Sequence, residues 1–321
     1  ESAEQARALF ADEEEGNVYS RYSNPNSDEL VRKLCLLEGA ETGIATGSGM
    51  AAVFVSLAAL LSSGDHLLAA RAIFGSTHQL LTRVLPRWGI SSSYVDMSAT
   101  EAEWEAAIRP ETRLLFVETP SNPGLDLIDL EMLSRVCRRH GVLLVVDNCF
   151  ATPHLQRPLD LGADLIVHSA TKFIDGQGRT LGGAVLGSAE RMREIAFFAR
   201  HTGPAISPFN AWMLSKSLET LAVRMDRHTS NALALARHFE GHGELEQVRY
   251  PFLESHPQYD LARRQMKGGG GIVVVVVRGG IDRARRFIDA LQLLSHSSNL
   301  GDARTIVTHP ASTTHSKLSE E

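Results

Sequence analysis

The 321-residue chain contains three cysteines, lacks a basic block and has no apolar run of the roughly 18 to 20 residues needed to span a membrane. Cys35, Cys137 and Cys149 lie in or beside apolar segments without a Cys-x-x-Cys spacing, which argues against a disulfide framework and a zinc site. We expect free thiols in a reducing compartment, the cytoplasm. Residues 1–15 are acidic and polar, unlike a secretory signal. The formal charge of −6, without a basic block, argues against nucleic acid as a partner.

What the chain does contain is a regular alternation of strand-like and helix-like segments. Over residues 42–187 this alternation predicts a mostly parallel sheet that is covered by helices on both faces. After Gly187 the pattern changes to helices, over about 188–200 and 209–240. A glycine run then leads to a strand over 272–277 and a helix near 281–294, which predicts a second, smaller α/β domain.

We therefore expect three parts. Residues 1–40 form an N-terminal arm and helix, 41–205 a large domain, and 206–321 a linking helix with a smaller domain. The abrupt last residues suggest that this smaller domain is truncated.

A lysine follows one of the predicted strands. The apolar run that ends at Val167 leads into Ser169, Thr171 and Lys172, and an upstream run over 142–146 ends at Asp147. Ligands of open α/β sheets bind at the carboxyl ends of the strands, so these side chains should lie close together. Alone, such a lysine is most often a solvated surface residue. Our hypothesis is that Lys172 forms a Schiff base with pyridoxal 5′-phosphate and that Asp147 pairs with the pyridine nitrogen.

Two segments could bind the phosphate of such a cofactor. Gly49 and Met50 lie in a glycine-rich stretch directly before a predicted helix, whose exposed N–H groups favour an anion. Tyr19 and Arg21 lie in a turn-rich arm, and a guanidinium can fork onto phosphate, although a solvated loop remains an alternative. Phe74 offers a flat face for the ring. No Walker loop, GxGxxG fingerprint or GxSxG elbow is present, and the scattered histidines predict no metal site.

Motifs along nearly the whole chain, in order, resemble the Cys/Met-metabolism family of pyridoxal-phosphate enzymes. The motifs are Tyr19-Ser20-Arg21-x-x-Asn24-Pro25, Ser48-Gly49-Met50-Ala51-Ala52, Glu118-Thr119-Pro120-Ser121-Asn122-Pro123, Asp147-Asn148-x-Phe150-Ala151-Thr152-Pro153 and His168-Ser169-Ala170-Thr171-Lys172.

The resemblance implies an α/β fold of the aspartate aminotransferase type (fold type I). It implies that Lys172 also moves protons, that Asn122 contacts the ring hydroxyl, and that Ser169 and Thr171 help to grip the phosphate. It further implies that Tyr19 and Arg21 reach the phosphate of a neighbouring subunit, within a homotetramer built as a dimer of dimers.

Within the family, several loops resemble the sulfhydrylases that act on O-succinylhomoserine. These loops cover 74–76, 175–179, 202–204 with 207–212, and 298–303 with 308–311. The implied reaction is a γ-replacement in methionine biosynthesis, in which sulfide displaces succinate and gives homocysteine. A cystathionine γ-synthase, a cystathionine or methionine γ-lyase and an O-acetylhomoserine sulfhydrylase remain alternatives.

Two positions depart from the family pattern. Phe74 lacks the phenolic hydroxyl of the tyrosine in relatives, and Asn299 stands where lyases and synthases carry serine. The resemblance places Asn299 near the expected substrate carboxylate, and Asn299 and Thr314 are our candidates for substrate contacts. The family's carboxylate-binding arginine would lie beyond residue 321. The acyl group, the choice between sulfide and cysteine, and the choice between replacement and elimination stay open.

Overall fold

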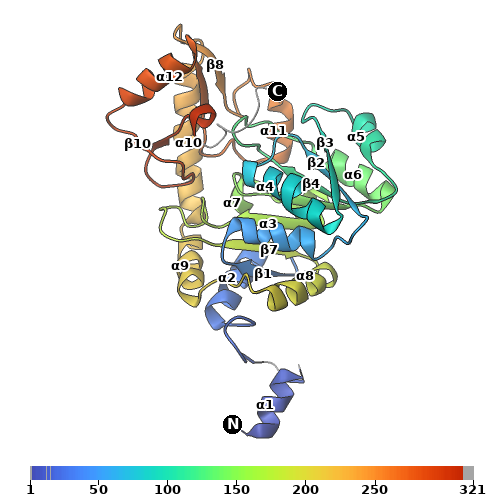
Figure 1. Cartoon of the computed structure of the whole chain (residues 1–321). Coiled ribbons are helices and arrows are strands. Elements are labelled where there is room, and N and C mark those ends of the chain that lie inside the picture. The colour runs from blue at the N-terminus through green and yellow to red at the C-terminus, as the bar shows by residue number, and fades with distance from the viewer. Residues whose placement is uncertain (1, 12, 15, 314–321) are drawn as a thin grey trace.

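The computed structural model describes residues 2–11, 13–14 and 16–313. Its centre is a seven-stranded sheet in the order β1-β7-β6-β5-β4-β2-β3, in which β7 alone runs antiparallel to its neighbours (Figure 1). The strands are β1 (Thr42–Thr46), β2 (His66–Ala70), β3 (Ser91–Val95), β4 (Thr112–Glu118), β5 (Leu143–Asp147), β6 (Leu165–Ser169) and β7 (Gly183–Gly187). The mostly parallel α/β sheet predicted from the alternation is confirmed.

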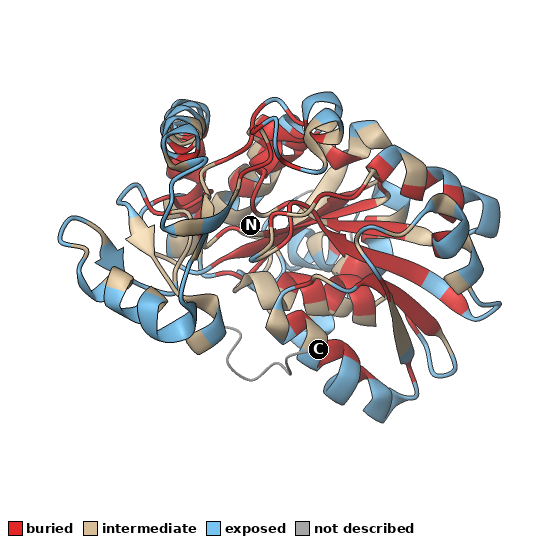
Figure 2. Ribbon diagram, turned by 90° about the horizontal axis from the view of Figure 1, so that it is seen from above, coloured by how far each residue is buried: buried red, intermediate tan, exposed pale blue. Residues whose placement is uncertain are grey.

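Helices cover both faces of the sheet because successive strand residues point to opposite sides. In β6, Leu165 and Val167 belong to one apolar core, whereas Ile166 belongs to the other. The helices that contribute to the first core are α3 (Gly49–Ala58), α5 (Glu101–Ala107), α6 (Leu130–His140) and α8 (Ala189–Thr202). The helices that contribute to the second core are α2 (Pro25–Glu38), α7 (Thr152–Leu155), α9 (Pro208–Leu218), α10 (Leu221–Phe239) and α11 (Tyr259–Gln265). The inner strands of the sheet are accordingly mostly buried, whereas the edge strands β1 and β3 are mostly half-buried. Exposed residues lie mainly on outer helix faces (Figure 2).

Local signals explain why α6 has the bounds that its sequence predicts. Asp129 caps the helix by accepting from Met132 N, and Gly141 ends it in the left-handed region at φ 65°. Leu133 and Cys137, four residues apart, are buried on one side of it. By contrast, the short strands β1 and β7 escaped prediction as individual strands, because glycine-rich segments have low strand propensity.

The single long helix expected over 209–240 is wrong, since the structure has two helices. α9 ends at Leu218 and α10 begins at Leu221. At this break the Ser217 carbonyl accepts from the Thr220 backbone N–H at 3.2 Å and from the Arg224 guanidinium at 3.0 Å. These competing partners replace regular helical hydrogen bonds, and neither glycine nor proline marks the break in the sequence.

The chain after α10 forms a smaller α/β unit. Its antiparallel pair is β8 (Leu245–Arg249) with β9 (Val274–Val277), contacted by α10 and α12 (Gly280–Asp289). The helix expected near 281–294 therefore ends earlier, and β10 (Ser295–His296) pairs with β11 (Ile306–Val307) beyond it. At the other end of the chain, α1 (Ala3–Phe10) stands away from the body (Figure 1). No helix among the described residues has the length and hydropathy of a membrane span.

Short helical segments complete the connections. α4 (Gly75–Gln79) continues into a π-helical turn over Leu80–Val84 and a 3-10 turn over Leu85–Trp88. Further 3-10 turns cover Pro158–Leu161 and Pro310–Ser312.

Candidate active site

The ends of three adjacent strands place acidic and basic groups at one edge of the sheet. In the strand register Glu118 of β4 lies opposite Asp147 of β5, and Asp147 lies opposite Val167 of β6. Ser169 ends β6, and Lys172 follows in the next turn, where its backbone N donates to Ser169 O at 3.2 Å. The sheet thus brings the Asp147 and Lys172 segments together, at the location predicted from the two apolar runs.

Lys172 is also adjacent to the C-terminal unit. Its Nζ donates to Asn299 Oδ1 at 3.4 Å, across 127 positions of sequence. The loop after Asn299 packs on the lysine turn so closely that a Cβ at Gly301 would lie 2.4 Å from Phe173 N, and Gly301 has a φ of +85° that favours glycine. The structure therefore joins one candidate substrate residue to the candidate catalytic lysine. The other, Thr314, lies outside the described residues.

An arginine from α10 holds the turn that follows Lys172. The half-buried Arg224 donates from Nη2 to Ile174 O at 3.1 Å and from Nη1 to Phe173 O. Charge-assisted bonds to two successive carbonyls fix the path of this turn. Sequence reasoning missed Arg224, because nothing distinguishes this arginine from others on a helix surface.

The two carboxyl groups at this edge both have raised pKa values. Burial raises the pKa of Asp147 to about 6, opposed by the Cys149 backbone N–H at 3.0 Å and by the charge of His168. Burial and then the negative charge of Asp147 raise the pKa of Glu118 well above its usual value. Burial and the neighbouring charge of Asp147 therefore both favour the neutral form of Glu118, whereas Asp147 is ionised above about pH 6. Glu118 accepts from Phe74 N at 2.9 Å, a role that the sequence did not predict.

A buried polar network lies behind Asp147. Glu38, at the end of α2, accepts at Oε1 from His168 Nε2 at 2.6 Å and from Asn148 Nδ2 at 2.9 Å. Gln156 donates to Asn148 Oδ1 at 3.0 Å and continues the network. These bonds tie the ends of β5 and β6 to α2, which supports the geometry of Asp147. Sequence reasoning missed Glu38, which lies 130 positions before His168 in the chain.

The start of α3 lies against the end of β6. Ser48 caps the helix by accepting from Ala51 N at 3.1 Å, which leaves the first N–H groups of the helix, those of Gly49 and Met50, without an intrahelical partner. A Cβ at Gly49 would lie 2.5 Å from Ser169 Cβ and 2.8 Å from Ser169 Cα. We call the start of α3 with Ser169 and Thr171 the phosphate cradle. In it, Thr171 Oγ1 accepts from Gly182 N at 3.2 Å. Helix N–H groups and hydroxyls that converge in this way fit a phosphate.

The remaining predicted residues divide into two groups. Phe74, 37% exposed, precedes α4 beside Glu118, and Asn122 lies in the loop that follows β4. Arg21 instead donates to Arg200 O, and its guanidinium carbon lies 5.3 Å from the Tyr19 ring centroid. Within this one chain, Tyr19 and Arg21 therefore contact each other and the end of α8. Among the described residues, no group of three or more His, Cys, Asp or Glu side chains is arranged to hold a metal ion.

The fold and this donor set define a pyridoxal-phosphate-dependent enzyme of fold type I, because an amine, a half-buried carboxylate and a helix start suited to phosphate follow or adjoin neighbouring strands at the same edge of the sheet. The model of the Cys/Met metabolism PLP-dependent enzymes matches residues 1–321, and the chain belongs to that family. The predicted family and cofactor are thereby confirmed.

Three relatives show how close the chain is to known members. It is 51% identical to an O-succinylhomoserine sulfhydrylase of Pseudomonas aeruginosa, over all of this chain and 79% of that protein. It is 42% identical to an L-methionine gamma-lyase of Pseudomonas putida, over all of this chain and 81% of that protein. A solved structure of a putative O-acetylhomoserine (thiol)-lyase from Campylobacter jejuni, with N′-pyridoxyl-lysine-5′-monophosphate, superposes with a TM-score of 0.95 at 34% identity, over all of this chain and 84% of that one.

Proposed function

We propose that the protein catalyses γ-replacement on O-succinyl-L-homoserine, with sulfide as the acceptor and L-homocysteine and succinate as products. The observation that carries the proposal is the 51% identity to a named O-succinylhomoserine sulfhydrylase, against 42% for a named methionine gamma-lyase. The motifs after Lys172 support the same reading, since Asp175-Gly176-Gln177-Gly178-Arg179 resembles the sulfhydrylase loop. In methionine biosynthesis this reaction incorporates sulfide directly into the carbon skeleton.

The site residues then have the following roles. When bound, pyridoxal phosphate supplies an electron sink that stabilises negative charge next to its imine carbon. The Lys172 amine binds the cofactor and moves protons between substrate carbons. Asp147, ionised at neutral pH, faces the pyridine nitrogen and keeps it protonated. Gly49, Met50, Ser169 and Thr171 hold the phosphate, Phe74 covers the ring, and Asn122 contacts the ring hydroxyl.

Asn299 contributes on the substrate side. Its Oδ1 accepts from Lys172 Nζ at 3.4 Å, so the side chain lies beside the amine that would be released when substrate displaces it from the cofactor. Phe74 has no hydroxyl and therefore cannot transfer a proton. Proton transfer at the substrate thus falls to Lys172.

The arm completes the site of a second copy of the chain in this proposal. Tyr19 and Arg21 are exposed and separate from the cradle of their own chain, which supports their reaching the phosphate of a neighbouring subunit. We propose a homotetramer of two such dimers, located in the cytoplasm. The same proposal divides the chain into the arm and helix at 1–40, the large domain at 41–205 and the smaller domain at 206–321.

The test is incubation of the purified full-length holoenzyme with O-succinylhomoserine and sulfide, with homocysteine, succinate, 2-oxobutyrate and ammonia all quantified. Homocysteine formed in step with succinate is the expected result. Predominant 2-oxobutyrate and ammonia would instead favour a γ-lyase, the reading that the 42% identity to a methionine gamma-lyase supports. A panel with acetyl and phospho esters, and with cysteine as acceptor, ranks the substrates.

A matched Lys172→Ala variant is the control. It should fold and assemble normally, because Lys172 makes one long side-chain hydrogen bond. It should lose turnover and the visible absorbance of the bound cofactor. Activity that persists without added amine would contradict the role of Lys172.

A further inference from the structure

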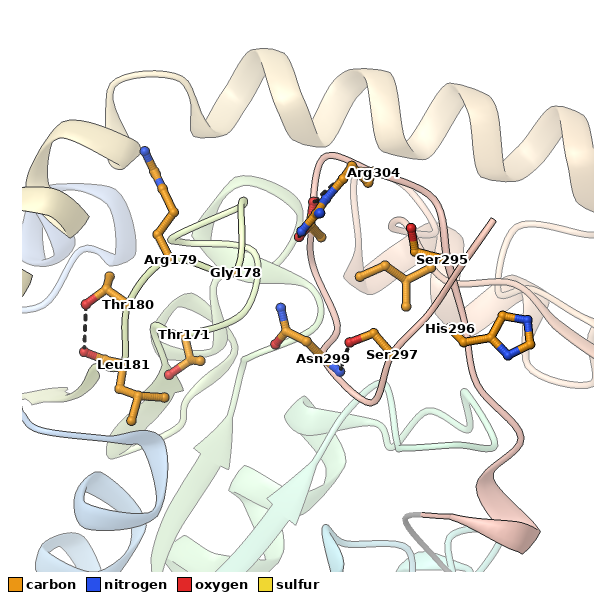
Figure 3. Close-up of a pocket in the computed structure, with 12 residues that line it drawn as sticks. Thr171, Gly178, Arg179, Thr180, Leu181, Ser295, His296, Ser297, Asn299 and Arg304 are labelled. Atoms are coloured by element: carbon orange, nitrogen blue, oxygen red, sulfur yellow. Dashed lines mark hydrogen bonds and ion pairs between the residues drawn. The ribbon is translucent and has the colours of Figure 1, made fainter. Parts of the chain in front are cut away.

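A cavity opens between the turn that follows Lys172 and the C-terminal unit. It has a volume of about 510 Å³ and is lined on one side by Gly178 and Arg179 and on the other by Asn299, Asp302 and Arg304 (Figure 3). That volume lies within the range of roughly 300 to 1,000 Å³ of small-molecule sites. Asn299 connects the cavity to the candidate catalytic amine, since its Oδ1 accepts from Lys172 Nζ.

The basic side chains of the cavity differ in what they already bind. Arg179 donates from Nε to Asp175 Oδ1 at 3.1 Å and from Nη2 to Ser217 Oγ at 2.7 Å, and it points away from Asn299 (Figure 3). His296, which also lines the cavity, has its Nε2 3.0 Å from Ile288 O. Both side chains are thus engaged with the protein.

Arg304 is held along one edge of its guanidinium. It donates from Nε to Asp302 Oδ1 at 3.1 Å and from Nη2 to Asp302 Oδ2 at 2.7 Å. Asp302 is itself only 6% exposed, so the pair has a fixed orientation, whereas the Arg304 side chain is 70% exposed. A guanidinium has five donors in a planar fork, and the edge that contains Nη1 remains for a second carboxylate.

The Asp302–Arg304 pair also lies close to the substrate side of the site. The position that a Cβ of Gly178 would take is 3.1 Å from Asn299 Nδ2 and 3.1 Å from Asp302 Oδ2. A substrate that reacts beside Lys172 and Asn299 could therefore extend its leaving group toward Arg304.

We propose that Arg304 determines the acyl specificity of the enzyme by binding the distal carboxylate of the O-succinyl group. This inference rests on the proposed function. A succinyl ester carries a free carboxylate at the far end of its acyl chain and an acetyl ester does not, so a fork-shaped cation in this position discriminates between them. Charge-assisted bidentate bonds to a carboxylate are among the strongest that a side chain forms.

The experiment compares kcat/KM for O-succinylhomoserine and O-acetylhomoserine, measured as release of succinate or acetate from the full-length holoenzyme. Arg304→Gln should lower the value for the succinyl ester about 10- to 100-fold, the loss expected for a hydrogen bond to a charged group. The value for the acetyl ester should stay within about twofold. Arg283→Gln is the matched control, because Arg283 forms an exposed ion pair with Glu244 in the same unit and should change neither value.

A double variant separates binding of the substrate from neutralisation of Asp302. Arg304→Gln alone leaves the Asp302 carboxylate unpaired, and that charge would repel a succinyl group. In Asp302→Asn/Arg304→Gln this repulsion is removed, so our proposal predicts that the succinyl value stays low. Recovery to the wild-type value would overturn it, as would an equal loss for both esters or no loss for either.

Succinate binding gives a readout that does not depend on turnover. Calorimetric titration of the holoenzyme with succinate should show weaker binding for Arg304→Gln by a similar factor, and equal affinity in both proteins would overturn the proposal. The release assay registers ester consumption whether homocysteine or 2-oxobutyrate is formed. If the wild-type enzyme forms 2-oxobutyrate, the proposed function fails, but the ratio of succinyl to acetyl ester consumption still tests the role of Arg304. If the wild-type enzyme forms homocysteine and Arg304→Gln has the same ester ratio as wild type, the Arg304 proposal fails and the proposed function stands.

Discussion

Replacing Asp147 by asparagine should have opposite effects on the apoprotein and on the holoenzyme. Burial raises the pKa of this carboxyl group from 3.8 to about 6 when no cation faces it. A folded-state pKa above the unfolded value means that ionisation opposes folding, and the cost grows between about pH 4 and pH 6 and is constant above that. The difference corresponds to about 3 kcal/mol at pH 8.

Asparagine removes this cost and keeps an oxygen that accepts from Cys149 N. We therefore expect Asp147→Asn apoprotein to be more stable than wild type by up to about 3 kcal/mol at pH 8, and by about half of that at pH 5. In the holoenzyme the sign reverses, because the variant loses a charge-assisted bond to the cofactor, and cofactor affinity should fall about 10- to 100-fold.

The assay is urea unfolding of both apoproteins at the two pH values, combined with cofactor titration followed by absorbance. An apoprotein that is destabilised by Asp147→Asn at pH 8, or whose stability change does not depend on pH, would refute the electrostatic reasoning. Unchanged cofactor affinity would refute the proposed partner of Asp147.

Three further substitutions test the surroundings of the site. Glu118→Gln should keep cofactor affinity within about threefold, since a neutral amide replaces a carboxyl whose neutral form is favoured by burial and by the charge of Asp147. A loss as large as that of Asp147→Asn in a cofactor titration would contradict this. Gly49→Ala should weaken cofactor binding at least about tenfold, because its Cβ collides with the end of β6, whereas Gly75→Ala, with no atom within 4 Å of the added Cβ, serves as the control. Arg21→Ala should lower cofactor retention on gel filtration if the arm reaches a neighbouring phosphate, and full retention would count against that contact.

Much of the site could be predicted because it follows strands. Apolar runs identify buried strands, and parallel strands deliver their next residues to one edge, so Asp147 and Lys172 could be placed together without coordinates. The start of α3 was recognisable for a similar local reason, since glycines before an apolar helix expose N–H groups. Motif resemblance then extended these local signals to a family, and the family match agrees.

Other parts depended on contacts between distant segments. Glu38 accepts a hydrogen bond from His168, which lies 130 positions away in the sequence. Arg224 donates to carbonyls of the turn after Lys172, about 50 positions away. Neither residue has a local sequence signature. The break between α9 and α10 also arose from side chains that compete for the Ser217 carbonyl. These contacts depend on how distant segments pack together, and that packing cannot be inferred from the local sequence around either residue.

The sequence by itself determined the strand–helix alternation, the lysine and aspartate at strand ends, and the glycine-rich helix start, because each is encoded within a few neighbouring residues. Only the tertiary structure decided that the pKa of Glu118 is raised, since that shift depends on its burial beside Asp147. It also brought Asn299 to Lys172 and turned Arg304 toward the cavity, because those distances depend on how the C-terminal unit packs against the sheet edge.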